Sequence, residues 1–196
     1  MNTVPAINPA AAFIIEAETP RDVAGRDSLL DRAMGPRWRR KSSEKLRRGR
    51  LPSEGLAFVA RDTDGRIVGT VRLWDVAMER EISATRKIGN CRALLLGPLA
   101  VDPAMKSAGI GSALMRHVIE EAARLGHGAI LLVGDAPYYA RFGFSAEKTG
   151  ALAMPGPYEK HRFLALELEA GALDGARGVL RAAGRKVETA RMAAAA

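Results

Sequence analysis

The chain has 196 residues, of which 47% are hydrophobic and 27% charged, and this composition fits one compact domain with at most a short appendage. It has no uninterrupted apolar run of about 18 residues, so we expect no transmembrane span. Its single cysteine and three histidines exclude a disulfide scaffold and a structural zinc domain. The net charge of +8 indicates an anionic partner such as nucleic acid, phosphate or a phosphorylated cofactor.

The first predicted elements are a strand and a helix. Residues 13–18 (FIIEAE) pass from an apolar run into alternation, which is typical of a strand. Residues 19–22 place a threonine N-cap, a proline and a carboxylate in the order that starts a helix, and we expect this helix to end at Gly35-Pro36. Residues 1–12 lack the basic region of a secretory signal, so we expect a flexible terminus and a cytoplasmic protein.

The next segment carries most of the net charge. Between Pro36 and Arg50 eight basic residues accompany one acid, Glu44, which gives the segment a charge of +7. The basic residues are Arg37, Arg39, Arg40, Lys41, Lys45, Arg47, Arg48 and Arg50. We expect a second helix or a turn here. A solvated helix face is the ordinary interpretation of such a run, and a site for an anion or an acidic partner is the alternative.

A hairpin is predicted after the basic segment. Residues 56–62 and 67–74 are β-rich runs joined by Asp64-Gly65, one of the stronger short hairpin patterns, so we expect an antiparallel pair. Residues 75–90 are polar and mixed, and their sequence fits either a loop or an extension of the strand.

A strand–helix–strand unit follows. Residues 94–101 (LLLGPLAV) are apolar on both faces, as in a buried central strand, and Gly97-Pro98 predicts a local break that frees backbone groups from the neighbouring strand. Residues 109–125 form an amphipathic helix with its apolar stripe at Ile110, Leu114, Val118, Ala122 and Leu125. Residues 129–134 are a second buried strand, which we expect to be parallel to the first.

The remaining segments are predicted as follows. On the solvent-exposed face of the helix at 109–125, Glu120 and Arg124 should form an ion pair one turn apart. A short helix at 137–142, a strand segment near Phe144 and a strand at 162–168 complete the sheet. We therefore expect one domain over residues 13–170. The extension 171–196 is rich in alanine and glycine and predicts a weak helix near 175–183 followed by a frayed end.

The loop Lys106-Ser107-Ala108-Gly109-Ile110-Gly111-Ser112 is a candidate phosphate site. A helix N-terminus presents unpaired N–H groups and a partial positive charge, and glycines let an anion approach the backbone closely. Lys106 and Ser112 can add a charge and a hydroxyl. A P-loop needs a Gly-Lys pair that is missing here, and a dinucleotide-binding fingerprint needs a small residue where Leu114 stands. Taken alone, the loop fits an ordinary helix start.

Its surroundings are more specific. The run from LLLGPLAVDPAMKSAGIGSAL to YYARFGF resembles the GNAT superfamily of acetyl-CoA-dependent N-acetyltransferases, over at least residues 56–168. The resemblance implies an α/β (α+β), three-layer fold with flanking helices, whose mixed and mostly antiparallel sheet holds a central splayed pair of parallel strands. It implies acetyl-CoA as co-substrate, no metal, direct transfer to a primary amine of a small molecule or protein, and a homodimer as a common assembly.

The resemblance also assigns contacts to the cofactor. Lys106-x-x-Gly109-x-Gly111 matches the family's Gln/Arg-x-x-Gly-x-Gly/Ala, whose backbone amides hold the CoA pyrophosphate, although lysine lacks the planar fork of arginine. Leu99 and Val101 match the strand whose backbone pairs with the pantetheine arm. The cofactor-binding residues implied in this way are Leu99, Ala100, Val101, Lys106, Ser107, Ala108, Gly109, Ile110, Gly111 and Ser112.

Tyr139 matches the tyrosine that the family carries before a Gly-Phe pair, here Gly143-Phe144. Its implied role is that of general acid to the CoA thiolate, for which a phenol with an ordinary pKa near 10 is suited. The alternative is a packing residue with one satisfied hydroxyl. The sequence departs from the pattern at Leu132, where many members have asparagine, so that cofactor contact is not carried over.

Few other residues are predicted to take part in the chemistry. A backbone amide near Gly97-Pro98 would polarise the thioester carbonyl, and no enzyme nucleophile is needed, so we interpret Cys91 and the three histidines as structural. The strand 94–99 offers no carboxylate. The general base stays unassigned among Glu79, Glu81 and a chain of water molecules.

The basic segment leaves two alternatives for function. The chain could be a non-catalytic CoA-binding module that uses Arg37 to Arg50 to bind an acidic partner or nucleic acid, but Trp38 is the segment's sole aromatic residue and no nucleic-acid motif is present. In an N-acetyltransferase, the same segment falls where the acceptor binds. We then expect an acceptor with a carboxylate or phosphate rather than a polycation.

Overall fold

A single sheet organises the computed structural model, which describes residues 13–35, 38–39, 41–82 and 87–187. Its strands are β1 (Phe13–Ala17), β2 (Ala57–Asp62), β3 (Ile67–Ile82), β4 (Lys87–Val101), β5 (Ala129–Val133), β6 (Leu152–Ala153), β7 (Phe163–Glu167) and β8 (Ala176–Ala182). They run in the order β1-β2-β3-β4-β5-β7, with β8 paired to β3 and β6. The terminal segments that we expect to be flexible, 1–12 and the last residues, lie outside the described residues.

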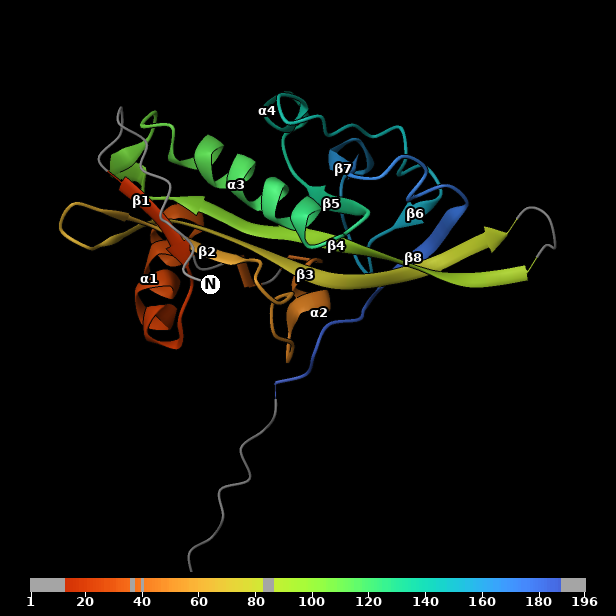
Figure 1. Cartoon of the computed structure of the whole chain (residues 1–196), viewed down its shortest axis with the longest axis horizontal. Coiled ribbons are helices and arrows are strands. Elements are labelled where there is room, and N and C mark those ends of the chain that lie inside the picture. Colours follow the sequence, from red (N-terminus) through yellow and green to blue (C-terminus); the bar gives the residue numbers. More distant parts are fainter. Residues whose placement is uncertain (1–12, 36–37, 40, 83–86, 188–196) are drawn as a thin grey trace, which may run out of the picture.

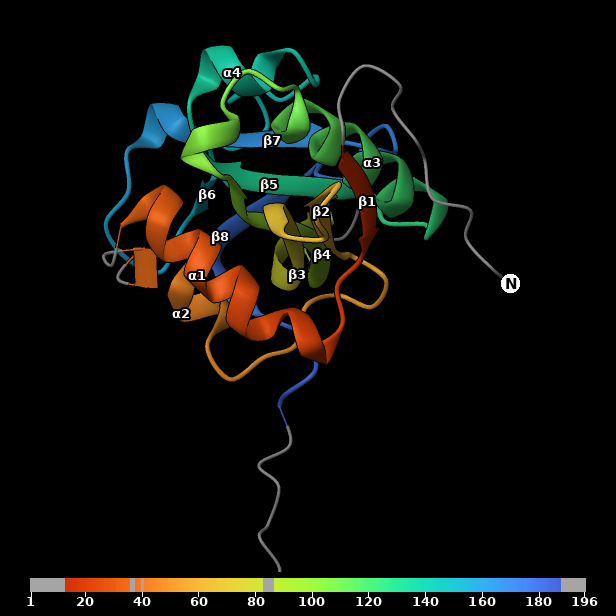
Figure 2. The same cartoon turned by 90° about the vertical axis from the view of Figure 1, so that its left-hand side faces the viewer.

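Helices cover both faces of this sheet. They are α1 (Val23–Met34), α2 (Glu44–Arg47), α3 (Ile110–Arg124) and α4 (Ala136–Ala140). Figures 1 and 2 show α1 and α2 on one face, with α3 and α4 on the other side. Apolar residues of α3 pack on the sheet to form one core, and Leu46 of α2 joins a second core on the other side. This arrangement confirms the predicted three-layer α/β fold.

The sheet is mixed and mostly antiparallel, as predicted. Its central parallel pair is β4 and β5, which are in register only at Leu94 with Ile130 and at Leu95 with Leu131. β4 continues to Val101, but its later residues pair with β3 alone. The two parallel strands therefore splay apart beyond Leu95, and this opening positions the site.

The predicted hairpin and the broken strand are both confirmed. β2 and β3 are antiparallel across Asp64-Gly65. In the β3–β4 pair, Val71 faces Leu99 and Leu73 faces Leu96, so Gly97 and Pro98 both lie opposite Arg72. This is a β-bulge, because two residues of one strand stand against one residue of its partner.

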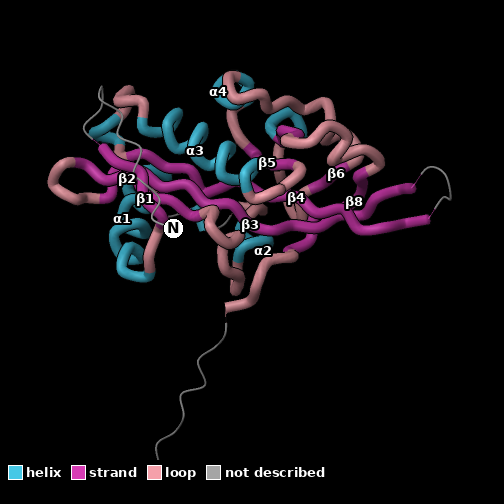
Figure 3. Tube along the Cα trace, viewed as in Figure 1, coloured by secondary structure: helices cyan, strands magenta, loops and turns pink. Residues whose placement is uncertain are grey.

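The segment 75–90, whose sequence fits a loop or a strand, extends both β3 and β4 into a long arm. The two strands stay paired as far as Ile82 and Lys87. Figure 3 shows β8 beside this arm, and β8 pairs with β3 from Val76 to Arg80. A third strand supplies hydrogen-bond partners along the edge of β3, and this pairing holds a mixed polar sequence in the extended conformation.

The predicted helix near 175–183 is wrong, because these residues contain strand β8. Leu180 and Ala176 are buried while Arg177 and Arg181 are exposed, the alternation expected of a strand with one covered face. Pairing with β3 and β6 overrides the helical preference of the alanines. The segment after residue 170 therefore contributes to the sheet and is not a helical appendage.

Three smaller expectations also differ from the structure. Arg124 pairs with Glu121, at 2.6 Å between Nη2 and Oε2, and not with Glu120, because the i, i+3 position is as close on a helix surface as i, i+4. Leu125 lies beyond the end of α3 and is exposed, so it is not part of the buried stripe. Near Phe144 the structure has an isolated bridge from Ser145 to Ala165 in place of a strand.

Candidate functional site

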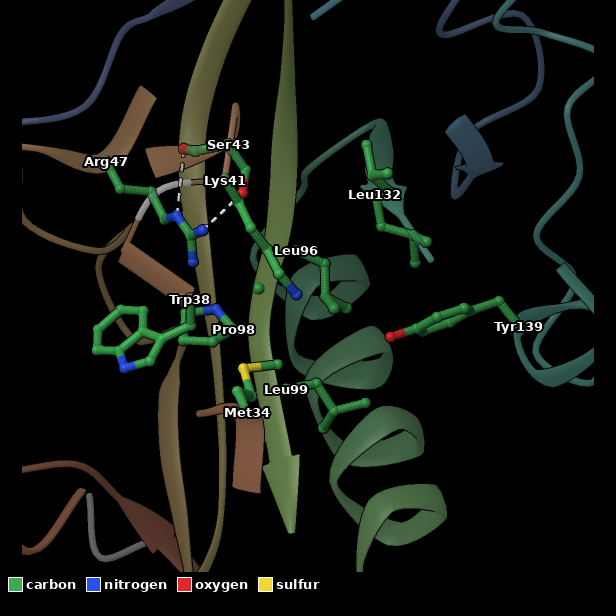
Figure 4. Close-up of a pocket in the computed structure, with 12 residues that line it drawn as sticks. Met34, Trp38, Lys41, Ser43, Arg47, Leu96, Pro98, Leu99, Leu132 and Tyr139 are labelled. Carbon is green, nitrogen blue, oxygen red and sulfur yellow. Dashed lines mark hydrogen bonds between the residues drawn. The ribbon is translucent and has the colours of Figure 1, made fainter. Parts of the chain in front are cut away.

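A pocket of about 70 Å³ lies at the opening between β4 and β5. The bulge of β4, the end of β5, the end of α1 and the segment that leads into α2 all contribute to its wall (Figure 4). Its lining residues are Met34, Trp38, Lys41, Ser43, Arg47, Leu96, Gly97, Pro98, Leu99, Leu132, Val133 and Tyr139. The pocket thus combines an apolar floor with the ends of two basic side chains.

The bulge is held in place by a buried indole. Trp74 of β3 is 6% exposed, and its Nε1 donates a hydrogen bond of 2.6 Å to the carbonyl oxygen of Gly97. Gly97 has φ of +132°, a conformation that residues with a Cβ rarely adopt, so glycine is needed here. The fixed carbonyl sets the direction of the backbone at the point where β4 loses its partner on the β5 side.

Tyr139 is placed on the opposite side of the pocket by α4, which follows β5. Its ring packs against Tyr138 and Phe144, with centroids 4.9 and 5.9 Å apart. A Cβ at Gly134 would lie 2.1 Å from Cε2 of Tyr139, so the ring occupies space that only glycine leaves. Figure 4 shows the hydroxyl directed across the pocket toward Leu96 and Leu99 of β4.

The Tyr139 hydroxyl is protonated at neutral pH. Burial raises the pKa of Tyr139 to about 12, with Tyr138 and Asp135 adding to the effect and Arg162 opposing it. Within the part of the chain that the structure describes, no group forms a hydrogen bond with this hydroxyl. The pocket therefore contains a proton donor whose proton forms no hydrogen bond with the described residues.

A second hollow, of about 370 Å³, lies at the N-terminus of α3. We call it the α3 groove, and it is lined by Val101, Met105, Lys106, Ser107, Gly109, Ile110, Gly111, Ser112, Tyr138 and Arg141. The first N–H groups of α3 have no intrahelical acceptor, and none of the described residues accepts a hydrogen bond from them. These free donors and two cationic side chains make the α3 groove suited to a phosphate ligand.

The turn between β4 and α3 is fixed by Asp102. Its Oδ1 accepts a hydrogen bond from the Ala104 N–H at 3.0 Å, and its Oδ2 lies 2.9 Å from Nη2 of Arg32 on α1. The Ala104 N–H, followed by Arg32, holds the pKa of Asp102 below its usual value. An ionised, buried carboxylate therefore ties α1 to the loop that begins the α3 groove.

Most of the residues predicted from sequence fall in these two hollows. Val101, Lys106, Ser107, Gly109, Ile110, Gly111 and Ser112 line the α3 groove, whereas Leu99 and Tyr139 line the pocket. Ala100 and Ala108 line neither hollow, because the Ala100 side chain packs with Leu30 and Trp38 under α1 and that of Ala108 packs against the main core. Tyr138 and Arg141, which sequence reasoning did not single out, line the α3 groove, and Arg141 lies 4.6 Å from the Tyr138 ring.

The basic segment does not form one solvated face. Arg39 pairs with Asp31 at 3.0 Å and stacks 4.3 Å from the Trp38 ring, and Arg50 donates to the Gly184 carbonyl oxygen at 2.6 Å. Arg47 is buried and lines the pocket together with Lys41. Arg37 and Arg40 lie outside the described residues. The interpretation as a solvated face is therefore wrong for Arg47 and holds for exposed residues such as Arg48.

The two candidate base residues lie elsewhere. Glu79 and Glu81 are on the long arm of β3, where they pair with Arg181 at 3.8 Å and with Arg177 at 2.6 Å on β8. They line neither hollow, so of the three candidates left open for the general base neither carboxylate lies at the pocket. Cys91 is buried on the same arm. In the described ranges no cluster of three or more His, Cys, Asp or Glu is placed to hold a metal ion, and no helix has the length and hydropathy to cross a membrane.

The sequence and the fold were compared with those of known proteins. Residues 53–146 match the family model of the acetyltransferase (GNAT) domain. The uncharacterised N-acetyltransferase YhbS of Escherichia coli K12 is 28% identical over 168 residues, which are 86% of this chain and 95% of YhbS. The crystal structure of YhbS in complex with CoA superposes with a TM-score of 0.71 at 27% identity, over 91% of this chain and 93% of that one. Residues 53–146 are therefore a GNAT acetyltransferase domain.

Two further acetyltransferases are similar over different lengths. The uncharacterised N-acetyltransferase YjhQ of Escherichia coli K12 is 37% identical over 71 residues, or 35% of this chain and 39% of YjhQ. A GNAT family acetyltransferase from Brucella melitensis, solved in complex with acetyl-CoA, has a TM-score of 0.53 and 26% identity, covering 83% of this chain and 98% of its own. The GNAT fold and N-acetyltransferase class expected from the sequence are therefore confirmed.

Proposed function

We propose that this GNAT enzyme transfers the acetyl group of acetyl-CoA directly to a primary amine, with Tyr139 as the general acid. The observation that carries the proposal is the position of the Tyr139 hydroxyl, which is directed across the opening between β4 and β5 toward the strand that carries the Gly97-Pro98 bulge. An acyl group and an attacking amine that meet at the bulge would have a proton donor on the facing wall.

The α3 groove supports binding of the CoA pyrophosphate. The first-turn N–H groups of α3 and the positive end of its dipole favour an anion, and the side chains of Lys106 and Arg141 add two positive charges. The edge of β4 that faces β5 is unpaired from Leu96 onward and offers backbone groups to the pantetheine arm. An extended molecule with phosphate at one end and a thioester at the other would then run from the α3 groove to the pocket.

The chain's own residues supply two functions to the reaction. When the amine nitrogen forms a bond to the thioester carbonyl carbon, negative charge develops on the carbonyl oxygen, and a backbone N–H at the bulge donates a hydrogen bond to it. When the carbon–sulfur bond breaks, Tyr139 gives its proton to the departing sulfur. Burial raises the pKa of a thiol just as it raises the pKa of Tyr139. The pKa difference between the phenol and the thiol therefore stays close to that of the free groups, and burial does not prevent the proton transfer.

The amine must also lose a proton. None of the described residues that line the pocket carries a carboxylate. We propose that water carries this proton to solvent and that the same route returns a proton to the Tyr139 oxygen. The overall reaction then moves one proton from nitrogen to sulfur and leaves the enzyme unchanged.

The proposal is tested with the purified protein, acetyl-CoA and a panel of amines. We expect acetyl-CoA to raise the melting temperature, since a ligand present at 100 times its Kd stabilises a protein by about 2.7 kcal/mol. We also expect at least one amine to yield free CoA thiol and an equal amount of N-acetylated product by mass spectrometry. Absence of binding at millimolar acetyl-CoA would refute the proposal.

A further inference from the structure

Arg47 is a buried cation with one nitrogen that has no hydrogen-bond partner among the described residues. Its side chain is 5% exposed. Nε donates to the Ser43 carbonyl oxygen at 3.2 Å and Nη2 donates to Ser43 Oγ at 2.6 Å, which fixes the plane of the guanidinium. Nη1 is buried and makes no hydrogen bond with any of the described residues. A buried donor without an acceptor is destabilising and uncommon in native proteins, and this one belongs to a side chain that lines the pocket.

The free nitrogen lies beside the bulge. Arg47 lines the pocket, and its Nη1 is 3.9 Å from the position that a Cβ would take at Gly97. Figure 4 shows the guanidinium among Ser43, Trp38 and Pro98. A group bound to Nη1 would therefore lie close to the place where the amine and the thioester are proposed to meet.

The charges around the pocket favour an anion. The Lys41 ammonium also lines the pocket, and burial, followed by the charges of Arg47 and Arg162, lowers the pKa of Lys41. Glu44 is the acidic side chain whose charge acts on Arg47. Its carboxylate lies 3.6 Å from Nε, on the edge of the guanidinium that already donates to Ser43, and so it does not partner Nη1. Arg72 adds positive charge and is itself paired with Glu18. An anionic group on the ligand would satisfy Nη1 and offset the repulsion between the cations.

We propose that the acceptor is a compact amine with a carboxylate a few bonds from the reacting nitrogen, and that Arg47, together with Lys41, binds that carboxylate. The inference rests on the proposed function, because it names the substrate class of the same site. The pocket holds about 70 Å³, which suits a small molecule, and two cations in its wall repel a polyamine. The CoA phosphates have their own site, since the α3 groove and the pocket share no lining residue.

The test compares amino acids with their amides as acceptors at saturating acetyl-CoA, for example glycine with glycinamide and alanine with alaninamide, with spermidine as a polycation. Each pair differs only in the carboxylate, and the amide has the more easily deprotonated amine, so reactivity alone would favour the amide. We expect kcat/KM to be about 10- to 100-fold higher for the carboxylates, the range for a hydrogen bond to a charged group. Binding of the N-acetylated products is measured in parallel by calorimetry.

Two substitutions of Arg47, with one substitution of Arg48 as the control, test whether the preference for carboxylates depends on Arg47. Arg47→Gln should remove it by lowering kcat/KM for the carboxylates to the level of the amides, and should remove the tighter binding of the carboxylate products. Arg48→Gln, which removes the same charge from an exposed neighbour, should keep both. Arg47→Met preserves the buried volume without the charge and serves as a second variant, and the melting temperature and the Kd for acetyl-CoA report whether each protein is folded.

The outcomes separate the inference from the proposed function. A wild-type enzyme that acetylates amides and spermidine as fast as amino acids would overturn the inference and leave the proposed function in place. An equal loss for charged and neutral acceptors in both Arg47 variants, with acetyl-CoA still bound, would also overturn it, because Arg47 would then act on the thioester. Acetylation of no amine at all would refute the proposed function and the inference with it.

Discussion

Gly134→Ala should displace the Tyr139 ring and lower kcat, although the tyrosine itself is unchanged. The added Cβ would lie 2.1 Å from Cε2 and 2.8 Å from Cδ2 of the Tyr139 ring. Non-bonded carbons rest about 3.5 Å apart, so the ring must move by about 1.5 Å. Tyr138 and Phe144 pack on the ring and limit how it can move. Since a misplacement of about 1 Å can lower a rate by roughly 100-fold, we expect kcat to fall by about that factor.

The assay is a double-mutant cycle on kcat. In the background of Tyr139→Phe, the proton donor is already gone, so Gly134→Ala should have little further effect. Gly150→Ala is the matched control, because a Cβ at Gly150 meets nothing within 4 Å. The Kd for acetyl-CoA should change little in Gly134→Ala, as Gly134 does not line the α3 groove. Equal losses from Gly134→Ala in both backgrounds, or no loss in the wild type, would refute the reasoning.

Three further predictions test other parts of the site. Because the protonated form of Tyr139 is the active one and its pKa is about 12, kcat should rise with pH as the amine deprotonates and should not fall until the pH approaches that value; a decline near pH 10 that Tyr139→Phe abolishes would contradict this. Trp74→Phe removes the donor to the Gly97 carbonyl oxygen, so urea unfolding should show a loss of about 1–3 kcal/mol, and a loss within error would contradict the role of this hydrogen bond. Lys106→Gln should weaken acetyl-CoA binding several-fold, more at low salt than at high salt, whereas the exposed Lys160→Gln should not; equal effects would show that only net charge matters.

The elements that could be predicted from sequence are those with local patterns. The turn at Asp64-Gly65, the stripe of α3 and the Gly97-Pro98 bulge depend on residues close together in the chain, and the structure contains all three. β8 could not be predicted in this way. Its alanines favour a helix in isolation, and it becomes a strand because the distant edge of β3 offers hydrogen-bond partners.

The same distinction applies to the site. The residues of the α3 groove are nearly contiguous from Val101 to Ser112, so a single motif could indicate most of them. The pocket is assembled from distant segments, and Arg47 is one of eight basic residues that look alike in the sequence. Only burial and the two hydrogen bonds to Ser43 separate it from exposed neighbours such as Arg48.

The most direct test of the central claim is the turnover of Tyr139→Phe beside the wild type, at saturating acetyl-CoA and with an amine that the wild type acetylates. We expect the wild type to release CoA thiol and N-acetylated amine in equal amounts. We expect the variant to bind acetyl-CoA with the same Kd and to turn over about 10²- to 10⁴-fold more slowly, the usual contribution of a general acid. Unchanged turnover in Tyr139→Phe would contradict the claim that this hydroxyl gives its proton to the departing sulfur.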